Sequence, residues 1–270
     1  MNRPLSVRRA GLAIVALVLS GMAAACSSSP GTPASGSSSG PGSTPAVTGT
    51  VTVFAASSLK ETFTSIAKRF EAAHPGTTVV LSFAASSALA TQITSGAPAD
   101  VFASASAKDM ATLTSAGAAT APTTFATNSL TVVVPSANPA QIAGLADLAR
   151  AGVKVAQCQA AVPCGVLAAK VLATAGLTVT PATLEPDVKS VLTKVRLGEV
   201  DAGLVYVTDA VAAAGSVTAV PIPAGVNATT AYPIAALSHA ANPAGARAFV
   251  DAVVSAEGLA VLKAAGFGAP

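Results

Sequence analysis

Short runs of β-prone residues in this chain lead repeatedly into segments with helical periodicity, and this pattern limits the folds open to it. Residues 51–55 form the first such run. The large apolar residues behind it are spaced by four, three and four positions, which puts them on one face of a helix: Leu59, Phe63, Ile66 and Phe70. Ser58 and Glu61 have the spacing of a capping box at the helix start. A buried strand followed by an amphipathic helix is predicted here.

The same alternation continues along the chain. Further strands are predicted at 78–83, 101–103, 130–134, 153–156 and 202–207, and helical patterns follow several of them. Strands that alternate with helices are typical of an α/β fold, in which helices cover both faces of parallel sheets.

Composition and charge exclude several classes of protein. The chain has 270 residues, of which 51% are hydrophobic and 10% are charged, and its mean hydropathy is +0.63. These values exclude global disorder and allow a sizeable core. Arg3, Arg8 and Arg9 precede every acidic residue, which leaves twelve of the 15 basic residues against 12 acidic ones in the remainder. Because this neutral body lacks a basic surface for phosphates, no nucleic acid is expected as a partner.

The first 25 residues are predicted to be a signal peptide. The three arginines precede an apolar run at 10–19 and a segment of small residues that ends at Cys26. The run is too short to span the roughly 30 Å of hydrocarbon in a bilayer, so no transmembrane anchor is expected. Ala-Ala-Ala-Cys at 23–26 resembles a bacterial lipobox, which implies a lipid on Cys26; cleavage without lipidation is the alternative. We expect an exported protein, lipid-anchored at the outer face of the cytoplasmic membrane.

The segment 26–49 is predicted to be a disordered linker. Residues 27–49 contain eight serines, five glycines and four prolines. A segment with so few apolar side chains does not bury enough surface to fold. The folded body is therefore expected to begin near Thr50.

Several predicted helices start with small or polar residues, at the places where strands end. Open α/β sheets bind ligands at the carboxyl ends of their strands. A helix start leaves up to four backbone N–H groups unpaired and carries a partial positive charge, so several starts aimed at one point would bind an anion. Ser58 and Ser86 can equally act as helix caps, and Tyr206 as a core residue, so the residues alone leave these alternatives open.

Five sequence blocks occur in order along the body. They are Val-Phe-Ala-Ala-Ser-Ser-Leu at 53–59, Ser-Phe-Ala-Ala-Ser-Ser-Ala-Leu-Ala-Thr-Gln-Ile at 82–93, Gly-Ala-Pro-Ala-Asp-Val-Phe-Ala-Ser-Ala at 96–105, Asn-Ser-Leu-Thr-Val-Val-Val-Pro at 128–135 and Gly-Leu-Val-Tyr-Val-Thr-Asp-Ala at 203–210. Together they resemble the substrate-binding proteins of molybdate ABC importers. This resemblance implies an α/β, two-lobed type II periplasmic-binding-protein fold, in which each lobe is a sheet flanked by helices and the ligand lies between the lobes. Residues 50–128 plus 233–270 would form the first lobe, and 129–232 the second.

The resemblance also implies a binding site and its partners. Side-chain and backbone donors of Ser58 and Ser86, the backbone N–H groups of Cys164 and Val188, and the hydroxyl of Tyr206 would hold the ligand. That ligand would be molybdate, with tungstate as a second one, bound as an oxyanion and not through direct protein–metal ligation. No cofactor and no enzymatic step are implied. An ABC permease would be the protein partner, and a monomer is expected.

Two cysteines remain in the body, Cys158 and Cys164, six residues apart. In an exported protein such a pair is read first as a disulfide. A metal site is the weaker alternative, because neither His74 nor His239 lies at ligand spacing to the cysteines.

Three other functions are alternatives to molybdate binding. A binder of another tetrahedral oxyanion, such as sulfate, would use the same fold. An exported hydrolase with Ser58 or Ser86 as nucleophile would need a general base within reach, and the two histidines have no recognisable triad context. A purely structural surface lipoprotein would bind no oxyanion.

Overall fold

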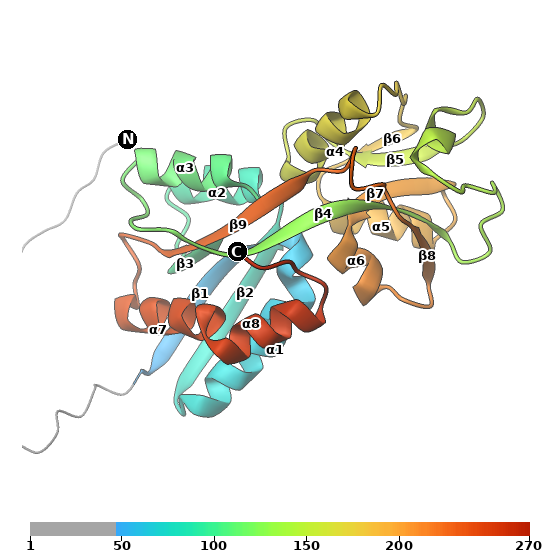
Figure 1. The fold of residues 1–270 in the computed structure, drawn as a ribbon. Helices are drawn as coiled ribbons and strands as arrows, with labels where there is room; N and C mark the ends of the chain where they lie inside the picture. Colours follow the sequence, from blue (N-terminus) through green and yellow to red (C-terminus); the bar gives the residue numbers. More distant parts are fainter. Residues whose placement is uncertain (1–46) are drawn as a thin grey trace, which may run out of the picture. The chain divides into compact units, whose positions relative to one another are not determined.

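A computed structural model describes residues 47–270 of the chain (Figure 1). The predicted signal peptide, Cys26 and nearly all of the predicted linker lie outside the described residues. Within those residues, no helix is both long and apolar enough to cross a bilayer. The first strand begins at Gly49, next to the expected start of the body.

Nine strands within residues 47–270 form one mixed sheet. The strands are β1 (Gly49–Ala56), β2 (Thr77–Ala84), β3 (Val101–Ala103), β4 (Thr123–Pro135), β5 (Val155–Cys158), β6 (Thr183–Glu185), β7 (Ala202–Tyr206), β8 (Val217–Val220) and β9 (Thr229–Ala236). Their order is β2-β1-β3-β9-β4-β7-β5-β6, and β8 pairs with β4. We call β2-β1-β3-β9 with the start of β4 the first section, and the end of β4 with β7, β8, β5 and β6 the second section.

The helices follow the strands as the alternation predicts. They are α1 (Lys60–Ala73), α2 (Ser86–Thr94), α3 (Ala107–Ser115), α4 (Pro163–Thr174), α5 (Val188–Arg196), α6 (Val207–Ala212), α7 (Pro243–Val254) and α8 (Ala256–Ala264). Two short 3₁₀ segments, η1 (Ser57–Leu59) and η2 (Leu145–Ala149), complete the described residues.

The expectation of purely parallel sheets was wrong. The β1–β2, β1–β3, β5–β6 and β5–β7 pairs are parallel, whereas β9 and β4 run antiparallel to all their neighbours. The chain between β4 and β9 runs through the whole second section, including α4, α5 and α6, so these two strands are not the neighbours of a simple strand–helix–strand unit, the connection that makes adjacent strands parallel. Strand β4 pairs with β9 as far as Ser129 and with β7 from Leu130, so it belongs to both sections. The predicted lobe boundaries near these positions stay predictions.

Helices cover both faces of the first section, and alternation along β1 explains why. Val51, Val53 and Ala55 belong to the apolar cluster that contains Phe63 of α1 and Phe249 of α7. Phe54 points to the opposite face, into a second cluster with residues of α2 and α3. Successive side chains of a strand face opposite sides of the sheet, so one strand supplies both cores. Figure 1 shows α1, α7 and α8 together on one side and α2 with α3 on the other.

A glycine lets a helix approach the second section closely. Gly203 lies on β7, and a Cβ built on it would be 2.8 Å from Val191 and 2.9 Å from Val195 of α5. Both valines are fully buried. Because glycine has no side chain, α5 packs directly on the strand that ends at Tyr206.

Candidate functional site

The five positions predicted to contact a ligand line one pocket. Ser58 comes from η1, Ser86 from α2, Cys164 from α4, Val188 from α5 and Tyr206 from the end of β7. Every one of them lies at the start of a helical segment or at the end of a strand. The pocket has an empty volume of about 200 Å³, part of which is open to solvent. That these residues contact a ligand stays a prediction.

Neither serine acts as a helix cap, so the expected capping box at Ser58 was wrong. Helix α1 has Leu59 at its N-cap, with no side-chain cap hydrogen bond, and Ala85 holds that position in α2. The Ser58 hydroxyl lies 2.8 Å from the hydroxyl of Tyr232 instead. The Ser86 hydroxyl oxygen accepts a hydrogen bond of 2.9 Å from the N–H of Ala105. Both side chains are buried. Because neither hydroxyl caps a helix, capping does not explain why serine occurs at these positions.

Backbone N–H groups supply a second set of donors. Ser86 and Val188 are the first residues of α2 and α5, and Cys164 is the second residue of α4. The first N–H groups of a helix have no partner within the helix. Among the described residues, none of the hydrogen bonds outside helices and strands uses these three N–H groups. They are therefore available to an anion, and the partial positive charge of each helix start favours one.

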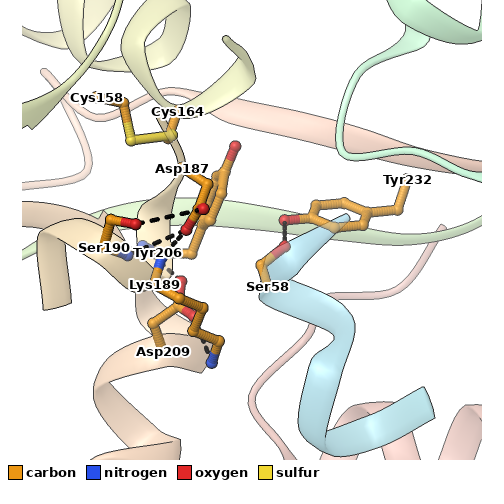
Figure 2. Close-up of a disulfide and its surroundings, with 9 residues drawn as sticks. All are labelled: Ser58, Cys158, Cys164, Asp187, Lys189, Ser190, Tyr206, Asp209 and Tyr232. Atoms are coloured by element: carbon orange, nitrogen blue, oxygen red, sulfur yellow. Dashed lines mark hydrogen bonds and ion pairs between the residues drawn. A yellow bond between two sulfur atoms is a disulfide. The ribbon is translucent and has the colours of Figure 1, made fainter. Parts of the chain in front are cut away.

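The turn before α4 is held by a disulfide and by close backbone packing. Cys158, at the end of β5, is bonded to Cys164, as the cysteine pattern predicts (Figure 2). Gly165 follows directly, and a Cβ built on it would lie 1.9 Å from the carbonyl oxygen of Gln159. Closing so short a loop contributes about 2 kcal/mol by the chain-entropy relation. The position of the Cys164 N–H is thus fixed from two sides.

Tyr206 contributes a hydroxyl that forms no hydrogen bond with any described residue. The side chain is 2% exposed, and its hydroxyl has no hydrogen-bond partner in the described part of the chain. Burial raises the pKa of Tyr206 well above its usual value, so the phenol keeps its proton at neutral pH. A buried hydroxyl without a partner carries a free-energy cost of about 1–3 kcal/mol, which an acceptor in the pocket would remove.

Two buried residues behind Ser58 were not predicted as part of the site. Tyr232 on β9 meets Ser58, and Asn128 on β4 donates from its Nδ2 to the Thr208 hydroxyl at 2.9 Å and to the Tyr232 hydroxyl at 3.5 Å. Both residues are buried. Asn128 lies in the fourth sequence block, but Tyr232 lies in no block and precedes a proline. Strand β3 pairs with both β1 and β9, and this long-range arrangement of the sheet brings Tyr232 to Ser58.

Among residues 47–270, the lining of the pocket includes no positively charged side chain. Within residues 47–270, Asp187 is the one charged residue in its lining. Its Oδ1 accepts from the N–H groups of Lys189 and Ser190, at 2.8 and 3.0 Å, and so caps α5 (Figure 2). An anion in this pocket would be held by neutral donors and helix dipoles.

Next to the pocket, one lysine forms ion pairs with two acidic residues. Lys189 Nζ lies 2.7 Å from Glu61 Oε2 on α1 and 2.8 Å from Asp209 Oδ1 on α6. Burial lowers the pKa of Lys189, but the charges and hydrogen bonds of Asp209 and Glu61 outweigh this, so the pKa is raised overall. Burial raises the pKa of Asp209 to about 6, in spite of the opposing effect of Lys189. These contacts link α1 of the first section to α5 and α6 of the second.

The contacts of the two serines do not fit a hydrolase. In the described residues, neither serine hydroxyl is bonded to a histidine, lysine or carboxylate that could act as a general base. Residues 47–270 also hold no group of three or more histidine, cysteine, aspartate or glutamate side chains placed to bind a metal ion.

The fold and the pocket together are those of a protein that binds a small solute. A family model of bacterial extracellular solute-binding proteins matches residues 51–268. The chain therefore belongs to this family of extracellular solute-binding proteins. The relatives that it matches are binding proteins and not enzymes.

Individual relatives of this chain are named for a specific ligand, molybdate. The molybdate-binding protein ModA of Mycobacterium tuberculosis is 42% identical over 258 residues, which cover 95% of this chain and 96% of that protein. The periplasmic molybdate-binding protein of Azotobacter vinelandii has a similar structure, with a TM-score of 0.71, 26% identity, and coverage of 82% of this chain and 99% of its own. The substrate-binding domain of a putative molybdenum ABC transporter from Clostridium difficile gives a TM-score of 0.62 at 26% identity, covering 82% and 99%.

Proposed function

We propose that this protein binds molybdate outside the cytoplasm and delivers it to the permease of an ABC importer. One observation carries the proposal: five donor-bearing positions from five elements line a single pocket, in which the described residues place no cationic side chain. The identity to a protein named as molybdate-binding supports the ligand. The similarity to a substrate-binding domain of a molybdenum ABC transporter supports the role in uptake.

Binding in this pocket requires no chemical reaction. The N–H groups of Ser86, Cys164 and Val188 and the hydroxyls of Ser58, Ser86 and Tyr206 would surround the oxygens of the dianion. Hydrogen bonds to an ionised acceptor are roughly twice as strong as bonds between neutral groups. Because the donors are buried, water competes with them weakly and each bond gains strength.

The proposal extends to a second ligand and to the location of the protein. Tungstate has the charge and shape of molybdate, so the same donors would bind it. Cys26 would carry the lipid that anchors the exported monomer to the membrane, and the serine-rich linker would hold the body clear of the surface.

Sulfate is the alternative ligand on the same fold. It is also a tetrahedral dianion and satisfies the same donors, but it is smaller than molybdate. Discrimination between the two must therefore come from the size of the closed pocket.

Calorimetric titration of the full-length chain with molybdate, tungstate, sulfate and phosphate tests the proposal. We expect saturable binding of the first two alone. A preference for sulfate or phosphate would reassign the ligand, and failure to bind any oxyanion would favour a structural surface lipoprotein. Tyr206→Phe, which removes one hydroxyl, should weaken molybdate binding about tenfold without unfolding the protein.

A further inference from the structure

The buried phenol of Tyr232 has a place in the molecule that the proposed contacts do not explain. Its side chain is fully buried, yet its hydroxyl lies 2.8 Å from the hydroxyl of Ser58 (Figure 2). Tyr232 and Ser58 are 174 residues apart, on β9 and directly after β1. Either oxygen of this pair could donate, so the direction of the bond depends on the neighbours of Tyr232.

Asn128 sets that direction. The backbone N–H of Ser129 donates to Oδ1 of Asn128 at 3.0 Å, so Oδ1 is the acceptor and Nδ2 faces the other way. Nδ2 lies 2.9 Å from the Thr208 hydroxyl and 3.5 Å from the Tyr232 hydroxyl. Among the described residues, the Tyr232 hydroxyl has two hydrogen-bond neighbours, the Ser58 hydroxyl and Nδ2 of Asn128. An amide nitrogen only donates, so the Ser58 oxygen is the acceptor that remains for the proton of Tyr232.

The consequence for Ser58 is a fixed polarity. Its oxygen accepts the proton of Tyr232, which leaves its own proton to point into the pocket. Ser86 reaches the same state by another route, because its oxygen accepts from the N–H of Ala105 at 2.9 Å. Both serines are thereby held as donors toward the ligand. Among the described residues, Asp187 is the one carboxylate of the lining: its Oδ1 accepts from two N–H groups of its own helix, and its Oδ2 accepts from the Ser190 hydroxyl at 3.4 Å.

We propose that Tyr232, oriented by Asn128, is a positioning residue that holds the Ser58 hydroxyl as a donor and so makes the pocket select oxyanions that carry no proton. This inference rests on the proposed function. A protonated oxyanion such as hydrogen phosphate needs an acceptor for its own proton, and a pocket of donors offers none. If Ser58 were free to rotate, its oxygen would become such an acceptor.

A double-mutant cycle on the full-length chain tests whether Tyr232 acts through Ser58. Tyr232→Phe keeps the ring and removes the hydroxyl, and it should weaken molybdate binding about tenfold, the lower end of the range for one hydrogen bond to a charged group. In a Ser58→Ala background the same change should have no further effect. Tyr206→Phe is the matched control, because a tyrosine that contacts the ligand directly should weaken binding equally in both backgrounds. Independent effects of Tyr232→Phe and Ser58→Ala would overturn the proposal.

Ligand selectivity gives a readout that simple loosening of the fold would not change. Tyr232→Phe should reduce the preference for molybdate over phosphate about tenfold, because Ser58 becomes able to accept. A purely structural defect would weaken both ligands alike, and that result would also contradict the proposal. Should Tyr232→Phe fail to fold, Asn128→Ala carries the same cycle, since it removes the donor that sets the direction.

The results distinguish a failure of the proposed function from a failure of the proposed role of Tyr232. Wild-type protein that binds no oxyanion would overturn the proposed function itself. Wild-type protein that binds molybdate, together with an additive cycle, would overturn only the role of Tyr232.

Discussion

Asp209 shows how one buried residue links the stability of this protein to pH. Its carboxylate is fully buried, with Lys189 at 2.8 Å and the N–H of Tyr206 at 3.3 Å from its two oxygens. Burial raises its pKa from the ordinary value of 3.8 to about 6. The folded state therefore holds a proton that the unfolded state has lost in this pH range, so stability falls as the pH rises through it.

Asp209→Asn should remove this dependence. Between about pH 5 and 7.5, the free energy of unfolding of the wild type should fall by about 1 kcal/mol more than that of the variant. Urea unfolding at the two pH values measures the difference. Asp251→Asn, which changes an exposed acid on α7, is the control and should behave like the wild type. Parallel pH dependence in wild type and Asp209→Asn would mean that the carboxyl titrates normally.

Among single residues, the sequence predicts those whose signal lies in their immediate sequence neighbourhood. Ser58, Ser86 and Tyr206 stand out because small polar or aromatic residues occur where strands end and helices begin. Tyr232 and Asn128 do not, because their role depends on contacts across 174 and 80 residues. Position along one element cannot reveal a partner that only the folded sheet brings near.

The start of α5 allows a backbone group to be tested as an element of the site. Val188 is the first helical residue, where proline is well tolerated because the N–H has no partner in the helix. Asp187 before it is extended, with φ −157° and ψ 171°, as a residue before proline prefers. Val188→Pro therefore deletes one N–H while the helix and its Asp187 cap are kept.

Val188→Pro should weaken molybdate binding by about ten- to a hundredfold, the range for a hydrogen bond to a charged group. Its thermal unfolding temperature should change little. Val188→Ala is the matched control: it keeps the N–H but removes buried methyl groups, so it should lose stability and keep its affinity. Calorimetry with thermal unfolding on both variants distinguishes these effects. Equal affinity of Val188→Pro and wild type would exclude this N–H from the site.

Helices with a clear periodic apolar face are predicted well. Strand β9 shows where prediction from the local sequence fails. The helix predicted around Val188, Val191 and Val195 is α5. Strand β9 contains Pro233, and a proline within a run argues against a strand. The proline is accommodated because it faces Thr124 of β4, where the register shifts. A bulge on the partner strand relieves the missing N–H, and nothing in the local sequence of β9 announces it.

The charge balance of the whole molecule predicts how salt affects binding. Residues 47–270 contain twelve basic and 12 acidic residues, and the described part of the pocket has no cationic side chain. Short-range hydrogen bonds in a buried pocket are screened far less than long-range attraction between exposed charges. The dissociation constant for molybdate should therefore change less than about threefold between about 20 and 500 mM sodium chloride. A steep loss of affinity, measured by titration at several salt concentrations, would indicate a cationic site.

The α/β class of the whole fold follows from the alternation of strands and helices, but the mixed sheet does not. Strand β4 extends from Thr123 to Pro135 and takes part in both sections, whereas its sequence suggested only the apolar end at 130–134. The polar half of the strand is stabilised by its pairing with β9 and not by its own composition. Such pairing is a property of the assembled sheet.

In the proposed site, Cys164 and Val188 contact the anion through their backbone N–H groups, and this has an evolutionary consequence. A peptide N–H is the same whichever side chain its residue bears, so in the proposed site the side chains of these two residues matter for the disulfide and for core packing, and not for contact with the anion. Gly165 cannot be replaced, because the backbone of Gln159 occupies the space of any side chain. Comparisons that score residue identity would therefore give weight to the glycine that shapes the turn and overlook the two neighbours proposed to bind the anion.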